Sequence, residues 1–331
     1  MPVAPAGPRG GQDKRILLLT PRGFCAGVVR AIDVVKIALR LFGSPIYVRK
    51  EIVHNRHVVE ELRSLGAIFV DELNDVPSGA RVIFSAHGVS PEVRSDAKAR
   101  NLDVIDATCP LVTKVHLEAL KFAREGYSIL LIGHRDHDEV VGTMGEAPAS
   151  TIVVSDEAEA AVVEVPNPER TVYLTQTTLS LDETTGIISI LKSRFPKMHG
   201  PPAQDICYAT ENRQLAVKAI APRIDLLLVV GSQNSSNSRR MVEVCANSGV
   251  PAFLVDDERD VKPEWFRGAS VVGVTAGASA PENLVQGLIS ALGNGYGFHS
   301  VEEVEVKDED VRFSLPAELN AASQRLTTIR V

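Results

Sequence analysis

The sequence predicts an α/β protein built from three similar small lobes. Three lone cysteines, Cys25, Cys109 and Cys207, each stand at the start of an expected amphipathic helix. An apolar strand follows each helix, and a polar residue lies 29, 28 and 28 residues beyond the three cysteines in turn. These polar residues are His54, His137 and Ser235. Regular self-similarity is typical of repeated units, so we expect the lobes to share one central site.

The first cysteine helix has a regular apolar face. Apolar residues recur at alternating steps of four and three, and Gly43 is a natural C-terminal stop. This face comprises Val28, Ile32, Val35, Leu39 and Phe42. A strand then leads to His54. A second strand, RVIFSA, runs into the polar loop AHGVSPE, where Ser90 precedes Pro91 and predicts another helix start.

The second and third lobes repeat this order. The apolar runs TVYLT and SVVGVTA alternate with helices and therefore indicate parallel strands in βα units. The loops after these strands also predict helix starts. One contains a capping box formed by Ser180 and Glu183, and in the other Ser279 lies two residues before Pro281.

The same patterns divide the chain. Residues 1–14 are rich in Pro and Gly and are expected to form a disordered tail. The lobes are expected at 15–108, 109–206 and 207–297. The segment 298–331 contains an alternating stretch, VEEVEV, that can pair as an edge strand, and its end is expected to be disordered.

Composition narrows the class of protein. The net charge of −7 among 331 residues argues against a general nucleic-acid or anionic-membrane binder. No apolar run approaches the roughly 18 residues that a membrane-spanning helix needs. The N-terminus lacks the apolar region of a secretory signal. Four scattered cysteines without such a signal favour free thiols in a reducing cytoplasm, so we expect a cytoplasmic protein.

The three lone cysteines allow three interpretations: zinc ligands together with a histidine, ligands of an iron–sulfur cluster, or core thiols. Cys245 has no polar loop attached and is expected to be a core thiol. The other three occupy equivalent helix starts, where the helix dipole is expected to lower a thiol pKa. The short C-x₂₋₄-C pairs of structural zinc sites are absent from the sequence. Three thiolates fit a cubane cluster with one iron lacking a protein thiolate.

The polar loops suit an anion. Histidines head three of them, and neutral donors near expected helix N-termini head others, which is a typical phosphate environment. Taken alone, these residues are more simply turn and capping groups. The candidates are His54, His87, His137, Ser235, Ser236, Asn237 and Ser279. The P-loop pattern does not occur, which excludes that type of nucleotide site.

Glu139 is the candidate acid. It lies two residues after His137 at an expected strand end, where it would face both a cluster and an anion. Burial and like charge both raise a carboxyl pKa, so Glu139 is expected to hold a proton near neutral pH.

Together these motifs resemble one family. The matching segments are PRGFCAGVVRAI, EIVHN, FSAHGVSPEV, DATCPLVTKVH, GHRDHDEVVGTMGE, YLTQTTLS, DICYATENRQ, GSQNSSNS and TAGASAPE. They span about residues 16–297 and resemble the 4-hydroxy-3-methylbut-2-enyl diphosphate reductase family, which acts last in the non-mevalonate isoprenoid pathway.

The resemblance implies a pseudo-threefold arrangement of the lobes around a central [4Fe–4S] cluster. Its ligands would be Cys25, Cys109 and Cys207, with one iron open to substrate. Glu139 and Thr177 are implied to be catalytic, near the substrate hydroxyl. Substrate binding is implied for His54, His87, His137, Thr178, Ser235, Ser236, Asn237 and Ser279. An electron donor such as ferredoxin or flavodoxin is the implied partner.

The implied reaction is a reductive dehydroxylation that yields isopentenyl diphosphate and dimethylallyl diphosphate, with Glu139 as proton donor. Two other hypotheses remain open from the residues alone. A hydratase would use the open iron only as a Lewis acid. A zinc-containing phosphosugar-binding or regulatory module would bind an anion with its polar loops and perform no chemistry.

Overall fold

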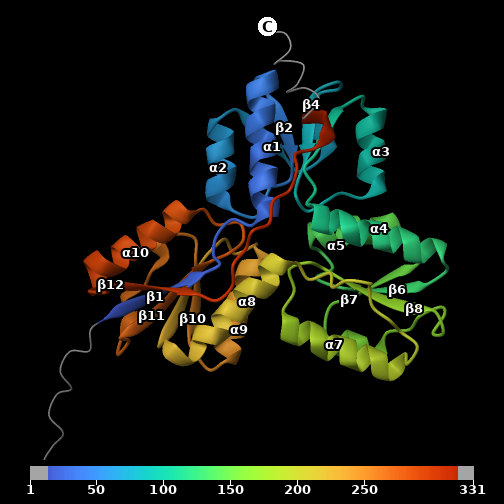
Figure 1. Cartoon of the computed structure of the whole chain (residues 1–331). Coiled ribbons are helices and arrows are strands. Elements are labelled where there is room, and N and C mark those ends of the chain that lie inside the picture. Colours follow the sequence, from blue (N-terminus) through green and yellow to red (C-terminus); the bar gives the residue numbers. More distant parts are fainter. Residues whose placement is uncertain (1–13, 320–331) are drawn as a thin grey trace, which may run out of the picture.

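The fold contains three separate sheets in which every strand pairing is parallel. The structure is a computed structural model, described here for residues 14–319 (Figure 1). Residues 1–13 of the expected N-terminal tail (1–14), and the expected tail from about 320 to the end, lie outside the described residues. Within the described part of the chain the sheets have four, three and five strands. Figure 1 shows the first sheet with its helices at the top, the second at the lower right and the third at the lower left.

The first sheet has the strand order β3-β2-β4-β5. Its strands are β2 (Ile46–Arg49), β3 (Ala67–Val70), β4 (Arg81–Phe84) and β5 (Asp103–Asp106). The helices of this group are α1 (Ala26–Phe42), α2 (Arg56–Ser64) and α3 (Pro91–Ala99). The apolar face of α1 packs with the buried sides of the strands in one core. As expected, Gly43 ends α1, with a φ of 76° that favours glycine.

The second and third sheets repeat the central order of the first. The second, β7-β6-β8, has strands β6 (Ser128–Ile132), β7 (Thr151–Val154) and β8 (Thr171–Thr175). Its helices are α4 (Pro110–Arg124), α5 (Asp138–Glu146), α6 (Glu157–Val162) and α7 (Leu181–Arg194). The third sheet, β10-β9-β11-β1-β12, has strands β9 (Leu226–Val230), β10 (Ala252–Val255), β11 (Val271–Ala276), β1 (Arg15–Thr20) and β12 (Ser300–Glu305). Its helices are α8 (Tyr208–Ile220), α9 (Ser236–Asn247) and α10 (Glu282–Tyr296).

The expected first boundary, a lobe covering 15–108, needs a correction. Strand β1 pairs with β11 and β12, so the chain starts in the third sheet. The reason lies in the repeat: the strand that leads into a cysteine pairs with the preceding sheet. Strand β5 precedes Cys109 and pairs with β4, and His199, upstream of Cys207, forms a bridge with Val172 of β8. The first such strand has no preceding sheet along the chain, and it completes the third.

The C-terminal part of the described chain connects two sheets. Strand β12 forms an edge of the third sheet, where the alternating sequence indicated a strand. Beyond it the chain crosses to the first sheet group, as Figure 1 shows in red. There Leu319 is fully buried in the core that contains α1. Among residues 14–319, no helix combines the length and apolar character needed to cross a bilayer.

Helix starts agree with the sequence patterns except in two details. Ser90 and Ser180 cap α3 and α7 through their side chains. The capping box is only half formed, because the carboxylate of Glu183 accepts a hydrogen bond from Arg240 at 2.8 Å. Pro281, rather than Ser279, occupies the cap position of α10, and the Ser279 hydroxyl donates elsewhere.

Candidate active site

All thirteen residues singled out from the sequence line one cavity. They approach it from the carboxyl ends of parallel strands and from helix N-termini, where ligands of α/β proteins usually bind. They are Cys25, His54, His87, Cys109, His137, Glu139, Thr177, Thr178, Cys207, Ser235, Ser236, Asn237 and Ser279. The cavity therefore gathers residues from all three sheet groups.

The three cysteines occupy the cap positions of α1, α4 and α8 without capping hydrogen bonds from their side chains. All are free thiols. The expectation of a lowered thiol pKa is wrong for Cys109 and Cys207 in this form of the protein. Burial raises the pKa of Cys109 to about 12 and that of Cys207 to about 11, outweighing the nearby backbone N–H groups. A cation at this position would reverse the balance, because a coordinating thiol is deprotonated.

Gly27 leaves the space between two of the thiols open. A Cβ atom at this position would lie 2.8 Å from the Cys109 sulfur and 3.8 Å from the Cys25 sulfur. A side chain there would crowd both sulfurs. The described chain thus brings three thiols, a donor set suited to iron–sulfur clusters, around a space that a glycine keeps clear. Cys245, by contrast, is completely buried in an apolar core, as predicted.

The histidines form a compact triangle. The rings of His54 and His87 stack with centroids 4.0 Å apart, and the His137 ring lies 5.4 Å and 5.8 Å from them. Burial lowers the pKa of His87 well below its usual value and that of His137 to about 3. The Nδ1 atom of His137 accepts a hydrogen bond from the Glu139 amide, so the neutral ring carries its proton on Nε2.

A second set of candidate metal ligands shares two histidines with the triangle. Ligand atoms of His54, His87 and Asp138 lie within 4.8 Å of one another, close enough to hold a metal ion. Only nitrogen and oxygen donors are present in this set, so it differs in chemistry from the three thiols. The same histidine N–H groups also suit an anion.

Glu139 is a buried carboxyl fixed by one neighbour. Its side chain accepts a hydrogen bond from the Thr177 amide at 2.6 Å and one from the Thr177 hydroxyl at 3.0 Å. Burial raises the pKa of Glu139 to about 7, although these two hydrogen bonds oppose the shift. The predicted direction is confirmed. A carboxyl with this pKa can donate a proton near neutral pH.

The serine and asparagine side chains connect neighbouring loops. The Ser236 hydroxyl donates to the Thr178 carbonyl at 3.0 Å, and the Ser279 hydroxyl donates to the His54 carbonyl at 2.9 Å. Asn237 accepts a hydrogen bond from the Ala278 amide at 3.0 Å. Ser235 caps α9, the simpler role considered for it from the sequence. The same side chains therefore line the cavity and hold its walls together.

Sequence reasoning missed several residues of the site. Asn234 donates to Glu51 at 2.8 Å and lies 3.5 Å from the Nδ1 atom of His54. Phe313, in the segment after β12, closes part of the cavity. Gly27 is two residues after Cys25 in the motif CAG. A search of the sequence for small residues close to the candidate cysteine ligands would have found it. No local pattern indicates Phe313, because its position depends on how the C-terminal segment crosses the molecule.

Comparison with known proteins now identifies the family. The family model described as LytB protein matches residues 16–293. The chain belongs to the LytB protein family. The LytB relatives include 4-hydroxy-3-methylbut-2-enyl diphosphate reductase of Rhodococcus jostii, which is 55% identical over 95% of this chain and 94% of the relative. The reductase of the same name from Burkholderia pseudomallei is 54% identical over 94% of this chain and 99% of the relative.

Solved structures agree with this assignment to the LytB family. The E-1-hydroxy-2-methyl-but-2-enyl-4-diphosphate reductase of Plasmodium falciparum superposes with a TM-score of 0.92 at 40% identity, over 95% of this chain and 99% of that one. A second structure is described as (E)-4-hydroxy-3-methyl-but-2-enyl diphosphate reductase, the terminal enzyme of the non-mevalonate pathway. It superposes with a TM-score of 0.60 at 31% identity, over 85% of this chain and 99% of that one.

Proposed function

We propose that the chain catalyses the reductive dehydroxylation of 4-hydroxy-3-methylbut-2-enyl diphosphate to isopentenyl diphosphate and dimethylallyl diphosphate. The substrate follows from the names of the LytB relatives. The observation that carries the chemistry is the position of Glu139, a buried carboxyl with a raised pKa, in the cavity lined by three thiols and three histidines. In this proposal one cavity combines the cluster ligands, an acid and an anion site.

The proposed cofactor is a [4Fe–4S] cluster held by Cys25, Cys109 and Cys207, with one iron open to substrate. Three free thiols at one cavity and the space beside Gly27 support this assignment. When bound, the cluster supplies single electrons and an iron that acts as a Lewis acid. In this proposal the three lobes have a pseudo-threefold arrangement around it, one cysteine from each.

The histidine triangle and the neighbouring polar loops are the proposed diphosphate site. Neutral His137 offers its Nε2–H, and a bound anion would raise the lowered pKa values of His87 and His137 and so strengthen the contact. Ser235, Ser236, Asn237 and Ser279 border the same cavity and lie near the N-termini of α9 and α10, which favour negative charge. Thr178 completes this wall beside Thr177.

Glu139 is the proposed proton donor. Removing the hydroxyl as water consumes two electrons and two protons, one proton going to the departing oxygen and one to a carbon of the allyl fragment. Glu139 holds a proton near neutral pH and would deliver it to the oxygen. Thr177 keeps the carboxyl in place through its hydroxyl and its amide. A small one-electron carrier such as ferredoxin or flavodoxin is the proposed donor, in a cytoplasmic setting.

No observation favours the other two hypotheses. Relatives that cover nearly the whole chain are named reductases, which speaks against a hydratase. The same names speak against a binding module without chemistry.

Metal analysis of cysteine variants tests the cofactor assignment. Anaerobically purified protein should be brown and contain iron and sulfide. Cys25→Ser, Cys109→Ser and Cys207→Ser should each lose most iron and nearly all turnover, because each removes one of three ligands. Cys245→Ala is the matched control and should retain both, because Cys245 lies in an apolar core. Normal iron content in any serine variant would contradict the ligand set.

A further inference from the structure

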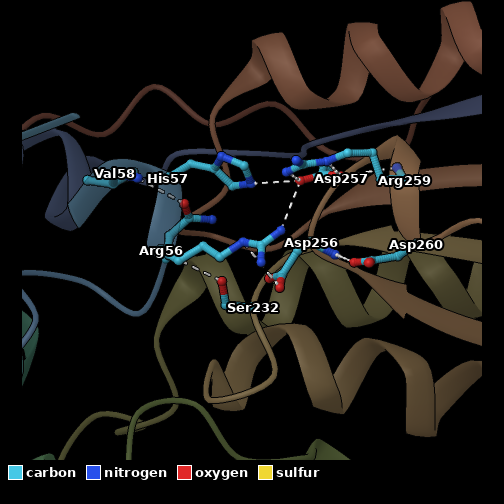
Figure 2. A network of polar contacts seen from close by, with 9 residues as sticks. Arg56, His57, Val58, Ser232, Asp256, Asp257, Arg259 and Asp260 are labelled. Carbon is cyan, nitrogen blue, oxygen red and sulfur yellow. Dashed lines mark hydrogen bonds and ion pairs between the residues drawn. The ribbon is translucent and has the colours of Figure 1, made fainter. Parts of the chain in front are cut away.

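The turn that carries His54 is held against the third lobe from outside the cavity. Figure 2 shows this polar network, in which residues at the start of α2 meet residues that follow β10. Its centre is Asp257, whose side chain is only 3% exposed. The network therefore joins the first lobe to the third, through residues that lie two and three positions after His54, a proposed substrate-binding residue.

Asp257 gathers the side chains of two arginines and one histidine. It accepts hydrogen bonds from Arg259 at 2.6 and 2.8 Å and from the Nη2 atom of Arg56 at 2.9 Å. The Nε2 atom of His57 lies 3.1 Å from the same carboxylate. The hydrogen bonds from Arg259 hold the pKa of Asp257 well below its usual range. Asp257 is therefore an anion near neutral pH. Its carboxylate binds Arg56 of the first lobe.

Arg56 makes the contact between the lobes specific. Its Nε atom lies 3.4 Å from Asp256 while Nη2 binds Asp257, so one guanidinium spans two carboxylates. Its backbone amide donates to the Ser232 hydroxyl at 3.4 Å. A planar guanidinium can satisfy two acceptors at once, whereas an ammonium group acts as a point charge.

Arg56 is two residues from His54, and hydrogen bonds hold the segment that joins them. The Asn55 side chain accepts a hydrogen bond from the Val58 amide at 3.1 Å and so caps α2. On the cavity side, Ser279 binds the His54 carbonyl. The turn is thus fixed at both ends by the third lobe, and a movement of Arg56 would displace the ring of His54.

Comparable groups lie at the other two junctions. Glu146 binds Arg94 at 2.7 Å and His116 at 2.9 Å between the first and second lobes. Arg240 binds Glu183, and its Nη2 lies 2.7 Å from the His134 ring, between the second and third lobes. The Asp257 network differs in one respect, because it contacts the residues that directly follow a histidine of the triangle.

We propose that Asp257 is a positioning residue of the diphosphate site, which acts through Arg56 and His57 to hold the His54 turn in the binding geometry. It does not touch the substrate. This inference rests on the proposed diphosphate site. It adds that diphosphate binding also depends on Asp257, a residue that does not line the cavity. Loss of the Asp257 charge should weaken binding of the diphosphate more than it slows the chemical step.

The main test is Asp257→Asn in the anaerobically reconstituted protein. The variant should fold, because Arg56 and Arg259 are 46% and 72% exposed and can be solvated. We expect KM for the diphosphate substrate to rise by about tenfold, within the usual range of coupling between sites, while kcat changes by less than about twofold. The affinity for inorganic diphosphate, measured by calorimetry, should fall by a similar factor.

Two further variants separate positioning from general stability. Asp103→Asn is the matched control, since it removes the ion pair with Arg81 inside the first lobe, away from the cavity. It should leave KM and diphosphate affinity unchanged. Arg56→Gln should reproduce the effect of Asp257→Asn. Arg56→Lys should bind diphosphate more tightly than Arg56→Gln but less tightly than wild type, because it keeps the positive charge but loses the planar guanidinium that spans two carboxylates. Hydrogen exchange of amides 52–58 should quicken in Asp257→Asn and not in Asp103→Asn.

The outcomes against the inference are distinct from those against the proposed function. If Asp257→Asn lowers the melting temperature but leaves KM, diphosphate affinity and exchange at 52–58 unchanged, Asp257 is only structural and the inference fails. An equal loss of kcat and iron would also overturn it. If wild-type protein does not convert the substrate, the proposed function fails, while diphosphate binding and exchange still decide the role of Asp257.

Discussion

Glu139 shows how a single buried side chain acquires a functional pKa. Two hydrogen bonds from Thr177 favour the carboxylate, and burial favours the neutral acid. Burial has the larger effect, so the pKa rises to about 7. Thr177 therefore orients the acid without making it too strong to hold its proton. This balance needs both residues, and they come from different segments, the start of α5 and the loop after β8.

Replacing Glu139 tests its role as a proton donor. Glu139→Gln keeps the size and most hydrogen bonding but has no acidic proton. We expect kcat to fall by about 10²–10⁴-fold, the usual contribution of a general acid, with iron content and diphosphate affinity retained. Steady-state kinetics and calorimetry check these two expectations. A variant that lost diphosphate affinity and kept its turnover at saturation would make Glu139 a binding residue instead.

The pH dependence follows from the same carboxyl. Its pKa is raised from about 4.5 to about 7 on folding, so the folded protein binds the proton more tightly than the unfolded chain. Its contribution to stability is thus fully present below about pH 4.5 and is lost as the pH rises through about 7. Turnover should fall as the pH rises through about 7, because Glu139 then loses the proton that it would donate. A pH profile of kcat/KM that stays flat through pH 7 would contradict this assignment.

Residue types predicted much of the site, but only part of its electrostatics. The raised pKa of Glu139 could be predicted, because a carboxyl at a strand end in a site of this kind is buried. The thiol pKa values could not. At Cys109, burial outweighs the hydrogen bonds from backbone N–H groups at the helix N-terminus, and the extent of burial depends on contacts between lobes. Likewise, Asp257 and Arg56 appear on the sequence as ordinary surface charges.

At the scale of elements, the three cysteine helices determine what can bind. Each cysteine stands at a helix cap, where the chain changes direction and the sulfur reaches the cavity. Gly27, in the first turn of α1, gives the Cys109 sulfur room to approach from another lobe. The helix starts could be predicted from sequence spacing, whereas the close approach of α1 to Cys109 requires the tertiary structure.

Gly27→Ala should impair cofactor binding through packing alone. The added methyl would lie 2.8 Å from the Cys109 sulfur, and overpacking of this kind costs about 1–3 kcal/mol. We expect reconstituted protein to hold less than roughly half the iron of wild type. Iron analysis after reconstitution measures this.

Gly295→Ala is the matched control for that change. Gly295 lies in α10, and among residues 14–319 no atom beyond its chain neighbours and its own helix backbone lies within 4 Å of an added Cβ. Alanine should therefore stabilise the helix by about 0.5–1 kcal/mol and leave iron content unchanged. Full iron loading of Gly27→Ala would show that the space beside the thiols is wider than the structure indicates.

At the scale of the whole molecule, the chain joins its first strand to its last sheet. Sequence periodicity predicted three α/β lobes and their order along the chain. It did not predict that β1 belongs to the third sheet, because the pattern of an isolated apolar strand contains no information about its partner. The sequence pattern likewise did not predict that residues 306–319 cross to the first sheet group. Long-range pairing, rather than local preference, decides both.

The most direct test of the proposed reaction is its electron count. Under anaerobic conditions, the reconstituted protein should convert 4-hydroxy-3-methylbut-2-enyl diphosphate only when a reduced viologen or reduced ferredoxin is present. We expect two electrons consumed per product molecule and both five-carbon diphosphates formed. Without donor, the substrate should change the visible spectrum of the protein and yield no product. Product formation without any donor, or a ratio far from two electrons per product, would contradict the reductase and favour a hydratase.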